Sequence, residues 1–572
     1  MLRPYKIDGS IALDNKITVK EILATYDEIS IVEEIIETVF LISMYGKQFL
    51  FAAPSKERQD LDVVIYLYND DGLSIPHVML EDETFPDLKA LPSGKYRAVC
   101  LYDKEGIVNS IISYEEKIVD AIDRLIELLS MNKCEQEREF QKEFMLYWNS
   151  TATGKNKFNV YLTNEKNFSE MDVYYCGKIA RVIERGISLS DIDERKGVER
   201  KWKKHLENNA YYIPILDNRE IVPPHRGYSW TIKDIRNIVY AKQIEHISSG
   251  TYETLKMTIS ERQNFILVFG MKLNNVNIVF AVKIVCKRTG RYSLLEKILD
   301  DTTSVETFFT ERKDYLYLNE QIGNDKNLLK KKVLIIGAGS LGSYVASEIV
   351  KNGATNLKIY DGDELEDANV CRWAYGGIGR GSNKAKVLAT LLNCSHPEIS
   401  VVAIDKNIDE KTLVEEMSQV DMIVFTVGNS DIQLKFNRIL KDNKCMTPVI
   451  FAWLEAGGVY SHILVVNYEK KGCFECLYTA ESGELTNNRS QKNDETDMES
   501  SIIRNGCGGT RAAYGTATIL RTTAALMETI GKIQEGELTE SILLDVSSNG
   551  VKVSEIKFPM EVCRCCGCTD EK

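Results

Sequence analysis

Apolar and polar positions in the C-terminal half of the chain form two kinds of segment. Short β-branched runs, VLII at 333–336 and MIVF at 422–425, are typical of strands buried on both faces of a parallel sheet. Other stretches carry apolar residues at helical spacing, among them IQLKFNRIL at 432–440 and the long segment 511–530. This pattern predicts an α/β domain with a parallel sheet over residues 325–572.

The region 1–150 has a different pattern. Residues 37–54 and 60–68 alternate as paired strands, and a further short strand carries Cys100. Residues 114–129 then place apolar side chains at i, i+3, i+4 and i+7, which predicts an amphipathic helix. We therefore expect a separate α+β domain.

The region 151–324 is the least informative. Two apolar runs flank Asn274 and Asn275, which predicts an antiparallel hairpin. We expect an α/β linker domain between the two better-defined regions.

Glycines follow the first buried strand of the C-terminal region. Gly337, Gly339 and Gly342 fill the pattern G-x-G-x-x-G, in which the glycines permit a tight turn, a close approach of the backbone to phosphate, and close packing of a helix. The N-terminus of the helix offers N–H groups to an anion. Asp361 closes the next strand, where an acid bonds a ribose hydroxyl. On their own, these residues predict a nucleotide site, for which NAD is the usual ligand.

The polar segment after Asp361 changes that interpretation. It contains Asp363, Asn369, Arg372 and then Lys384. A dinucleotide site seldom needs two fixed cations beside its pyrophosphate, whereas cleavage of ATP between the α- and β-phosphates builds charge on both fragments. Taken singly, Arg372 and Lys384 would be solvated surface residues. As a set after a glycine turn, they predict a phosphate site.

Composition limits the partners and the location. The net charge of −13 argues against nonspecific binding to nucleic acid or to anionic lipid. No apolar run reaches membrane-spanning length, and the start MLRPYKIDGS lacks a secretory signal, so we expect a cytoplasmic protein. In a reducing compartment the 14 cysteines should be buried residues, metal ligands or nucleophiles rather than disulfides.

Two C-x-x-C pairs predict a structural zinc site. Cys473 and Cys476 form the first pair, and the tail EVCRCCGC offers either Cys563 with Cys566 or a second pair shifted by two residues, Cys565 with Cys568. Four thiolates make a closed tetrahedral zinc site. The alternative is a group of small apolar side chains or redox thiols.

Cys507 stands apart from these pairs. A polar stretch of about 481–507 predicts a loop before it, and a long helical pattern follows. A thiol near the N-terminus of a helix has its thiolate stabilised, and the thiolate is a nucleophile. The alternative is a buried small hydrophobe.

The C-terminal block resembles the adenylation domain of ubiquitin-activating enzymes and of the adenylyltransferases that charge sulfur-carrier proteins. The motifs that carry the resemblance are GAGSLG, DGD, NVCR and GIGRGSNKA. It implies a Rossmann-like fold that binds ATP, with Asp361 on the ribose and Asn369, Arg372 and Lys384 on the phosphates. It also implies a zinc site completed by Cys563 and Cys566, and Cys507 as the reactive cysteine.

One departure concerns magnesium. The family carries a metal-binding aspartate after the next strand, where this chain has Gly428 and Asn429. Asp431 is a candidate replacement, and the alternative, which we favour slightly, is that it caps the following helix.

The N-terminal region resembles ubiquitin-conjugating enzymes, and more closely their bacterial relatives, through "C-L" at Cys100 and the segment EFQKEFMLYW that ends at Trp148. This implies that Cys100 is a second acyl carrier. The His-Pro-Asn triplet of the eukaryotic enzymes is absent, and His77 is a weaker candidate for polarising the thioester, because a lone histidine in a loop is more often structural.

Together, the two resemblances indicate a fusion similar to the ligase-like proteins of type II CBASS antiphage systems. The family implies a homodimer that activates the C-terminus of a CD-NTase or of a ubiquitin-like protein. The acyl group would pass to Cys507, then to Cys100, then to a target amine. Two other functions stay open: an adenylyltransferase that stops at the acyl-adenylate, and a scaffold without catalysis.

Overall fold

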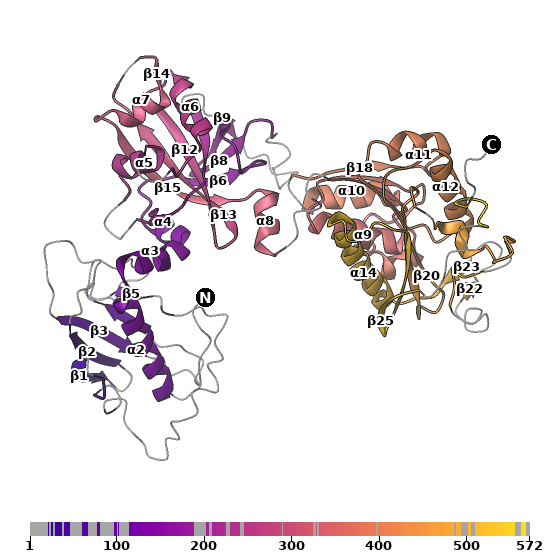
Figure 1. Cartoon of the computed structure of the whole chain (residues 1–572), viewed down its shortest axis with the longest axis horizontal. Helices are drawn as coiled ribbons and strands as arrows, with labels where there is room; N and C mark the ends of the chain where they lie inside the picture. Colours follow the sequence, from indigo (N-terminus) through magenta and orange to yellow (C-terminus); the bar gives the residue numbers. More distant parts are fainter. Residues whose placement is uncertain are drawn as a thin grey trace. The chain divides into compact units, whose positions relative to one another are not determined.

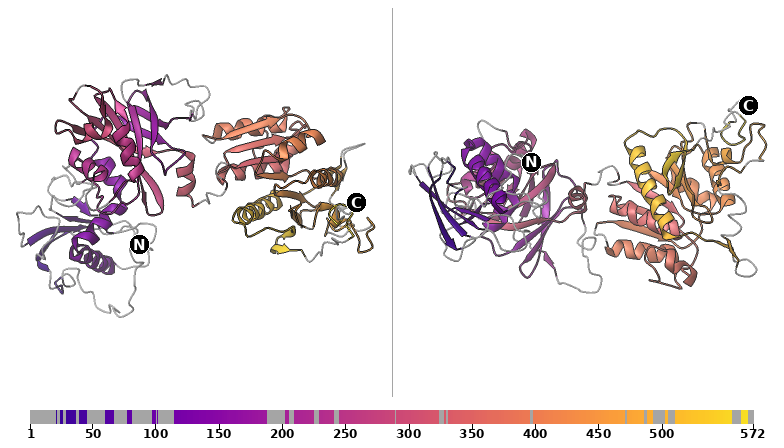
Figure 2. Two further views of the ribbon diagram at one scale, coloured as in Figure 1. Left: turned by 45° about the horizontal axis from the view of Figure 1, so that its top comes forward. Right: turned by 90° about the horizontal axis from the view of Figure 1, so that it is seen from below.

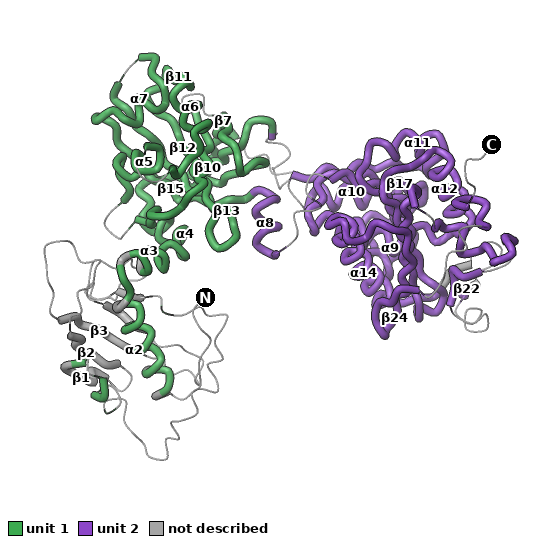
Figure 3. Tube along the Cα trace, viewed as in Figure 1, with its two compact units in different colours: residues 1–186, 200–313 green, residues 187–199, 314–572 purple. Residues whose placement is uncertain are grey.

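A computed structural model describes most of the chain. The described residues are 21, 24–26, 29–36, 39–45, 60–66, 77–80, 97–99, 101, 114–187, 202–204, 209–224, 229–240, 245–288, 290–323, 328, 331–395, 398–470, 472–485, 488–492, 502–504, 510–554 and 562–567. They divide into two compact units, which are coloured separately in Figure 3: Met1–Gly186 with Arg200–Lys313, and Ile187–Glu199 with Asp314–Lys572.

The N-terminal part of the first unit holds a five-stranded antiparallel sheet in the order β1-β2-β3-β4-β5 (Figure 1). Its strands are β1 (Ile29–Ile36), β2 (Val39–Tyr45), β3 (Asp60–Tyr66), β4 (His77–Leu80) and β5 (Arg97–Val99). The predicted pairing is confirmed, since Val39 opposes Tyr66 and Tyr45 opposes Asp60. His77 begins a strand rather than lying in a loop, which corrects the prediction for its backbone.

Helices follow this sheet at α2 (Tyr114–Ser130), α3 (Lys133–Lys142) and α4 (Phe144–Ser150). The amphipathic pattern at 114–129 therefore forms the predicted helix. Phe144 and Trp148 on α4 are fully buried against Trp230 and Phe280 of the region that follows, with ring centroids 4.8–6.0 Å apart. Trp148, which we expected to close the N-terminal domain, thus lies in the core of the middle region.

The middle region is an eight-stranded sheet that closes on itself through a pairing between β10 and β7, and β9 extends it outside the ring. Its strands are β6 (Lys157–Tyr161), β7 (Ser169–Cys176), β8 (Ile179–Glu184), β9 (Lys203–Lys204), β10 (Asn209–Ile215), β12 (Asn264–Leu273), β13 (Val276–Val285) and β15 (Ser304–Arg312). Helices α5 (Ile232–Val239), α6 (Ser249–Met257) and α7 (Leu294–Leu299) and the short pair β11 (Ile259–Ser260) and β14 (Tyr292–Ser293) complete it.

The predicted hairpin is confirmed as β12 and β13. Asn274 and Asn275 connect the strands with φ of 48° and 67°, the left-handed conformation that a tight two-residue turn requires. Successive residues of β12 enter different cores: Ile266 and Val268 lie in one apolar cluster, whereas Leu267 packs with the helices in the other. Two buried faces explain why these strands read as nearly continuous apolar runs.

The second unit holds an eight-stranded sheet in the order β18-β17-β16-β19-β20-β21-β24-β25. Its strands are β16 (Lys332–Ile336), β17 (Asn356–Tyr360), β18 (Ser400–Ile404), β19 (Met422–Phe425), β20 (Val449–Leu454), β21 (Ser461–Val466), β24 (Ile542–Ser547) and β25 (Gly550–Val553). The first five strands in this order are parallel and the others antiparallel, so the predicted parallel sheet is confirmed with an antiparallel extension.

Helices cover both faces of this sheet, as Figure 2 shows from two further directions. The helical elements are α8 (Tyr315–Gln321), α9 (Ser340–Lys351), η4 (Asp367–Arg372), α10 (Lys384–Ser395), α11 (Glu410–Met417), α12 (Ser430–Asp442), η5 (Phe474–Leu477) and α14 (Thr516–Gln534), and a separate pair of strands is formed by β22 (Ile502–Arg504) and β23 (Thr510–Ala512). Residues of α9, α10 and α14 share one apolar core, and residues of α11, α12 and η5 share the other. Among the described residues, no helix has the length and apolar character needed to cross a membrane.

Candidate functional site

The glycine loop lies at the carboxyl end of β16, in the middle of the parallel strands. The connection after β16 leads to β17 on one side, and β19 pairs on the other side, so this is the switch point at which open α/β sheets bind ligands. Gly337 adopts a φ of 103° and donates its N–H to the Tyr360 carbonyl at 2.9 Å. Only glycine takes this conformation without strain.

The other two glycines have different surroundings. A Cβ on Gly342 would lie 2.6 Å from Thr426 Oγ1 and closer still to the Gly337 carbonyl, so the helix packs against the loop only because no side chain is present. A Cβ on Gly339 would meet nothing within 4 Å. Gly339 precedes α9 and offers no capping side chain, so the first turn of α9 faces this open space with N–H groups suited to an anion.

Asp361 binds the glycine loop. Its two carboxylate oxygens accept N–H groups of Ala338 at 2.6 Å and of Asp363 at 2.8 Å. Burial raises the pKa of Asp361, and the two backbone hydrogen bonds oppose this effect. The carboxylate thus fixes the turn and also lies beside the position of the predicted nucleotide.

Lys384 begins α10 and is 8% exposed. Its ammonium lies 3.0 Å from the carboxylate of Asp363, which is largely exposed, and its backbone N–H donates to the Asp363 carbonyl. Asn383 donates to the Asp361 carbonyl at 2.7 Å and so joins this helix start to the end of β17. A lysine with a buried stem and one exposed partner keeps its charge at a fixed position next to the loop.

Arg372 ends the short helix η4. Its guanidinium lies over the Tyr514 ring, 5.2 Å from the centroid, and Tyr514 Oη lies 2.7 Å from Ser340 Oγ. The next residue, Trp373, donates its indole N–H to the Ala338 carbonyl at 2.9 Å. These contacts bring Arg372 to the first turn of α9.

Asn369 lies on the same short helix. Its Oδ1 accepts the backbone N–H of Glu366 at 3.1 Å, so its side-chain amide is the group left to donate to a ligand. The structure therefore brings Gly337, Gly339, Gly342, Asp361, Asp363, Asn369, Arg372 and Lys384 to one end of the sheet. Helix N–H groups with two cations on an open side of the loop fit the phosphates of a nucleotide.

The segment after β19 corrects the prediction for Asp431. Asn429 is the cap of α12, because its side chain accepts the N–H groups of Asp431 and Ile432 at 3.0 and 3.1 Å. Asp431 is exposed in the first turn and does not cap the helix with its side chain. Its role as a magnesium ligand stays a prediction.

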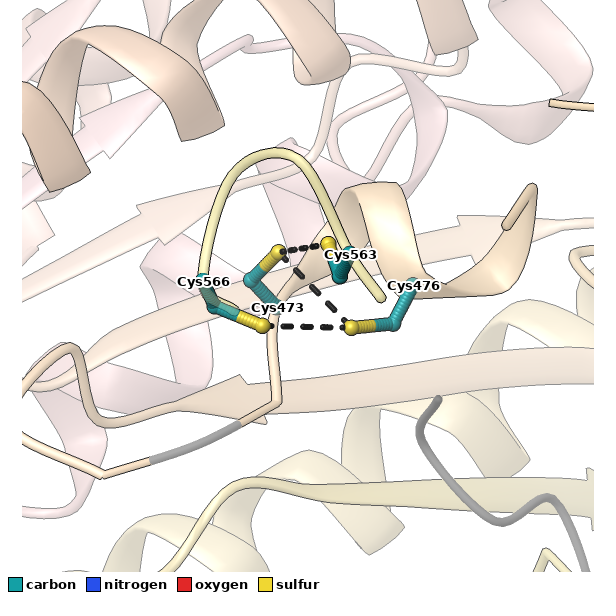
Figure 4. Close-up of side chains that lie close together, drawn as sticks. All are labelled: Cys473, Cys476, Cys563 and Cys566. Carbon is teal, nitrogen blue, oxygen red and sulfur yellow. Dashed lines mark hydrogen bonds between the residues drawn. The ribbon is translucent and has the colours of Figure 1, made fainter. Parts of the chain in front are cut away.

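Four cysteine sulfurs gather in the second unit (Figure 4). Cys473, Cys476, Cys563 and Cys566 are buried, and their sulfurs all lie within 4.8 Å of one another. The separations are 4.0 Å for 473–476, 3.9 Å for 473–563 and 3.3 Å for 476–566. A tetrahedron with metal–sulfur bonds of about 2.3 Å has edges of about 3.8 Å. The set fits a structural zinc ion.

Cys565, from the alternative tail pair, is not one of these four cysteines. Cys565 accepts a hydrogen bond from Asn437 at 3.3 Å, and Cys568 lies outside the described residues. Hydrogen bonding with Cys473 raises the pKa of Cys476 and lowers that of Cys563. Thiols packed this closely do not all ionise without a cation, which is what zinc supplies.

Both candidate nucleophiles lie outside the described residues. Cys100 directly follows β5. Cys507 lies between β22 and β23, which pair antiparallel with Arg504 opposite Thr510. The helix that we expected just after Cys507 begins only at Thr516, after β23. Stabilisation of a thiolate by the end of that helix is therefore not supported.

Sequence reasoning missed the polar group formed by His462, Glu455, Asp545 and Lys492. His462 lies 2.5 Å from Glu455 through Nε2 and 2.8 Å from Asp545 through Nδ1, and the His462 and Glu455 side chains are fully buried. Lys492 lies 2.5 Å from Asp545 and also donates its backbone N–H to Glu455 at 2.7 Å. The available signal in the sequence was one ionisable residue inside each of two apolar runs, His462 in SHILVV and Asp545 in ILLDVS.

Tyr514 and Thr426 were also missed. Thr426 donates to the Gly337 carbonyl at 2.8 Å and supports the glycine loop from the end of β19. Neither residue belongs to a spaced motif, so only the fold brings them to the site.

Parts of this chain are similar to known proteins. Residues 318–564 match the ThiF family. The chain is 21% identical over 552 residues to the ATP-dependent ubiquitin transferase-like protein Cap2 of Vibrio cholerae, covering 88% of this chain and 91% of that protein. Cap2 of Pseudomonas aeruginosa is 23% identical over 42% of this chain, and this match spans only 41% of the Pseudomonas protein.

Among solved structures, Escherichia coli MccB with ATP is similar to this chain. The match covers 42% of this chain and 68% of the MccB chain, with 20% identity and a TM-score of 0.33. The match to the ThiF family and the long match to Cap2 test the resemblance to fused ubiquitin-activating-type proteins that the sequence predicts. Residues 318–564 match the ThiF family model, in a chain that is similar along 88% of its length to a Cap2 protein, which confirms the resemblance to the fused ubiquitin-activating-type proteins of CBASS systems.

Proposed function

We propose that this protein uses ATP to activate the C-terminal carboxylate of a protein and conjugates it to an amine. One observation supports the first step: Arg372 is joined through Tyr514 to the first residue of α9, and Lys384 is joined through Asp363 and Asp361 to the glycine loop. This set suits a triphosphate better than a nicotinamide dinucleotide, because it supplies two cations as well as helix N–H groups.

In that step a carboxylate oxygen of the substrate protein attacks the α-phosphorus of ATP. The bond from the α-phosphorus to the bridging oxygen breaks, and pyrophosphate leaves with the electron pair. Arg372 and Lys384 would neutralise the charge that builds on the two fragments. Magnesium supplies further charge neutralisation when it is bound, and Asp431 is the carboxylate that we propose to hold it.

The next two steps are thioester transfers. The Cys507 thiolate attacks the acyl carbonyl and displaces AMP, and the Cys100 thiolate then displaces Cys507. A lysine amine of the target finally attacks this thioester, the carbon–sulfur bond breaks, and an amide forms as the Cys100 thiolate and a proton leave. Dividing the reaction in this way preserves the energy of ATP in covalent form. The support is the position of each cysteine in motifs that resemble the activating and conjugating families.

We propose a ubiquitin-conjugating-like fold for residues 1–150, a linker for residues 151–324 and an adenylation domain for residues 325–572. The five-stranded antiparallel sheet followed by α2 is consistent with the first assignment. From the resemblance to CBASS proteins, we propose that the activated protein is a CD-NTase or a ubiquitin-like protein and that the chain acts in antiphage defence. We also propose a homodimer, cytoplasmic location, and zinc on Cys473, Cys476, Cys563 and Cys566.

The test is to incubate the chain with ATP and a candidate carrier protein, and to compare reducing with non-reducing gels. Wild type should form an adduct that thiols cleave. Cys100→Ala should accumulate the adduct at Cys507. Cys507→Ala should form no adduct but keep ATP–pyrophosphate exchange, because adenylation precedes the thiol step.

Cys394→Ala is the matched control, since Cys394 is an exposed thiol outside the motifs. It should behave as wild type. Adducts that survive Cys507→Ala would contradict the proposed order. Exchange without any thioester in wild type would instead favour a sulfur-carrier-type adenylyltransferase, and no exchange with any carrier would favour a scaffold.

A further inference from the structure

We propose that Tyr514 is a positioning residue of the nucleotide site, which holds Ser340 and Arg372 in the orientation that binds the phosphates of ATP. The inference rests on the proposed adenylation and names a residue that no motif of the site contains. Tyr514 lies between β23 and α14. It reaches two parts of the site that are far from it in sequence.

The phenol hydroxyl makes the first contact. It lies 2.7 Å from the hydroxyl of Ser340, the first residue of α9. The N-cap of α9 is Gly339, which has no side chain to bind the N–H groups of the first turn. Tyr514 therefore fixes the Ser340 side chain at the edge of the anion site and leaves those N–H groups to a ligand.

The ring makes the second contact. The Arg372 guanidinium stacks over it, with Cζ 5.2 Å from the centroid. An aromatic face attracts a cation and restricts the plane of a guanidinium, whose N–H groups point outward in that plane. The ring thus fixes the direction in which Arg372 donates hydrogen bonds.

Tyr514 is itself held by the sheet. The preceding residue, Ala513, accepts the N–H of Gly457 at 2.8 Å, and Thr518 donates to the Gly458 carbonyl at 2.7 Å. Gly458 adopts a φ of 68°, and a Cβ there would lie 3.1 Å from the Tyr514 Cβ. These contacts hold Tyr514 against the turn after β20. Its hydroxyl and ring therefore keep the side chains of Ser340 and Arg372 in fixed positions.

Two substitutions at Tyr514 separate the hydroxyl contact from the ring contact, and a third substitution, at Tyr375, is the control. Tyr514→Phe removes the hydroxyl and keeps the ring, and Tyr514→Leu removes both. Tyr375→Phe is the matched control, because the Tyr375 hydroxyl also contacts a serine of α9, Ser347 Oγ at 3.2 Å, but farther along the helix. All three are compared with wild type in ATP–pyrophosphate exchange, in calorimetric binding of a non-hydrolysable ATP analogue, and in thermal unfolding.

We expect Tyr514→Phe to raise the KM for ATP and the Kd of the analogue about threefold, since one hydrogen bond is lost. Tyr514→Leu should raise both about tenfold, because the cation–π contact is lost as well. Tyr375→Phe should leave both unchanged. The unfolding temperatures of Tyr514→Phe and Tyr375→Phe should fall equally, which separates positioning from a contribution to the fold.

Coupling provides the second readout. In an Arg372→Ala background, Tyr514→Phe and Tyr514→Leu should change analogue binding equally, because the ring has lost its cation. In a Ser340→Ala background, Tyr514→Phe should have no effect. Additive effects in these backgrounds, or an unchanged Kd in Tyr514→Leu, would overturn the inference.

Failure of the proposed function gives a different result. A wild-type chain that binds the analogue without exchange would overturn the proposed activation, and the binding series would still decide the role of Tyr514. A wild-type chain that binds no ATP would overturn both.

Discussion

Replacing His462 by alanine is expected to weaken the sheet where β20, β21 and β24 meet. His462 directly opposes Trp453 on β20 and Asp545 on β24. Both ring nitrogens face carboxylate oxygens, at 2.5 and 2.8 Å. Only the imidazolium donates from both nitrogens, so this geometry favours the charged ring.

Two opposing effects act on the pKa of His462. Burial lowers the pKa of His462, but its hydrogen bonds to Asp545 and Glu455 outweigh burial and raise the pKa above 6.5. The two carboxylates are balanced by His462 and Lys492, so the group is neutral overall. Removing His462 leaves two buried carboxylates with one counter-charge, and breaking a buried ion pair in this way costs about 3–5 kcal/mol.

The raised pKa also gives a pH dependence with a defined sign. The folded protein holds the proton more tightly than the unfolded chain, so the stabilisation is complete below the unfolded pKa of about 6.5. This stabilisation is lost as pH rises through the folded pKa. Between the unfolded and the folded pKa of His462, the free energy of unfolding should fall by about 1.4 kcal/mol per pH unit. Above the folded pKa the dependence ends.

Hydrogen–deuterium exchange measured on peptides of β20 and β21 gives the local opening free energy directly. Wild type should lose local stability as pH rises above about 6.5, and His462→Ala should be less stable and show no such pH dependence. The control is His246→Ala, because His246 is also buried but faces a backbone carbonyl, that of Asp217 at 2.7 Å, rather than two carboxylates. Equal opening free energies in wild type and His462→Ala, or a flat wild-type profile, would refute the charged pair.

Three further changes test the rest of the second unit. Lys384→Met should lower ATP–pyrophosphate exchange by about 100-fold, because one of the two cations at the phosphates is lost while the apolar stem is kept. Gly342→Ala should abolish ATP binding measured by calorimetry, since its Cβ would lie 2.6 Å from Thr426 Oγ1, whereas Gly531→Ala in α14, with nothing within 4 Å, should bind normally. Metal analysis should find zinc in wild type and in Cys565→Ser but not in Cys476→Ser, which should also have a lower unfolding temperature; equal zinc contents in the two variants would contradict the proposed ligand set.

The sequence predicts the parallel sheet and the glycine loop because both follow from local rules. A strand buried on both faces is apolar throughout and rich in β-branched residues, and a turn with a φ of 103° at Gly337 needs glycine whatever the rest of the fold. The pairing of Cys473 and Cys476 with Cys563 and Cys566 follows from spacing and from the family resemblance. Each of these signals is local: the strand, the glycine turn and each C-x-x-C pair lie within a few residues, although the two cysteine pairs are 90 residues apart.

Local rules fail where a helix starts or where partners are far apart. Asn429 and Asp431 both lie near the start of α12 and both suit a cap, and only the backbone geometry selects Asn429. The residues before Thr516 read as the start of a helix, yet Thr510–Ala512 pair as a strand with β22. The closure of the middle sheet through β10 and β7 joins strands that carry no complementary motif, so periodicity alone predicts the strands and not the ring.

The chain that leads to Cys507 is fixed to the sheet on both sides of the undescribed residues. Before them, Ser490 accepts the indole N–H of Trp453 at 2.9 Å, and Arg489 donates to the Cys476 carbonyl at 2.7 Å. After them, Tyr514 contacts the first turn of α9 through its hydroxyl.

The described residues before the segment are therefore joined to Trp453 and Cys476, and those after it are joined to Ser340. Under the proposed function, Tyr514 contacts the nucleotide site and also follows the Cys507 segment in the chain, so that Tyr514→Leu should slow thioester formation as well as weaken ATP binding.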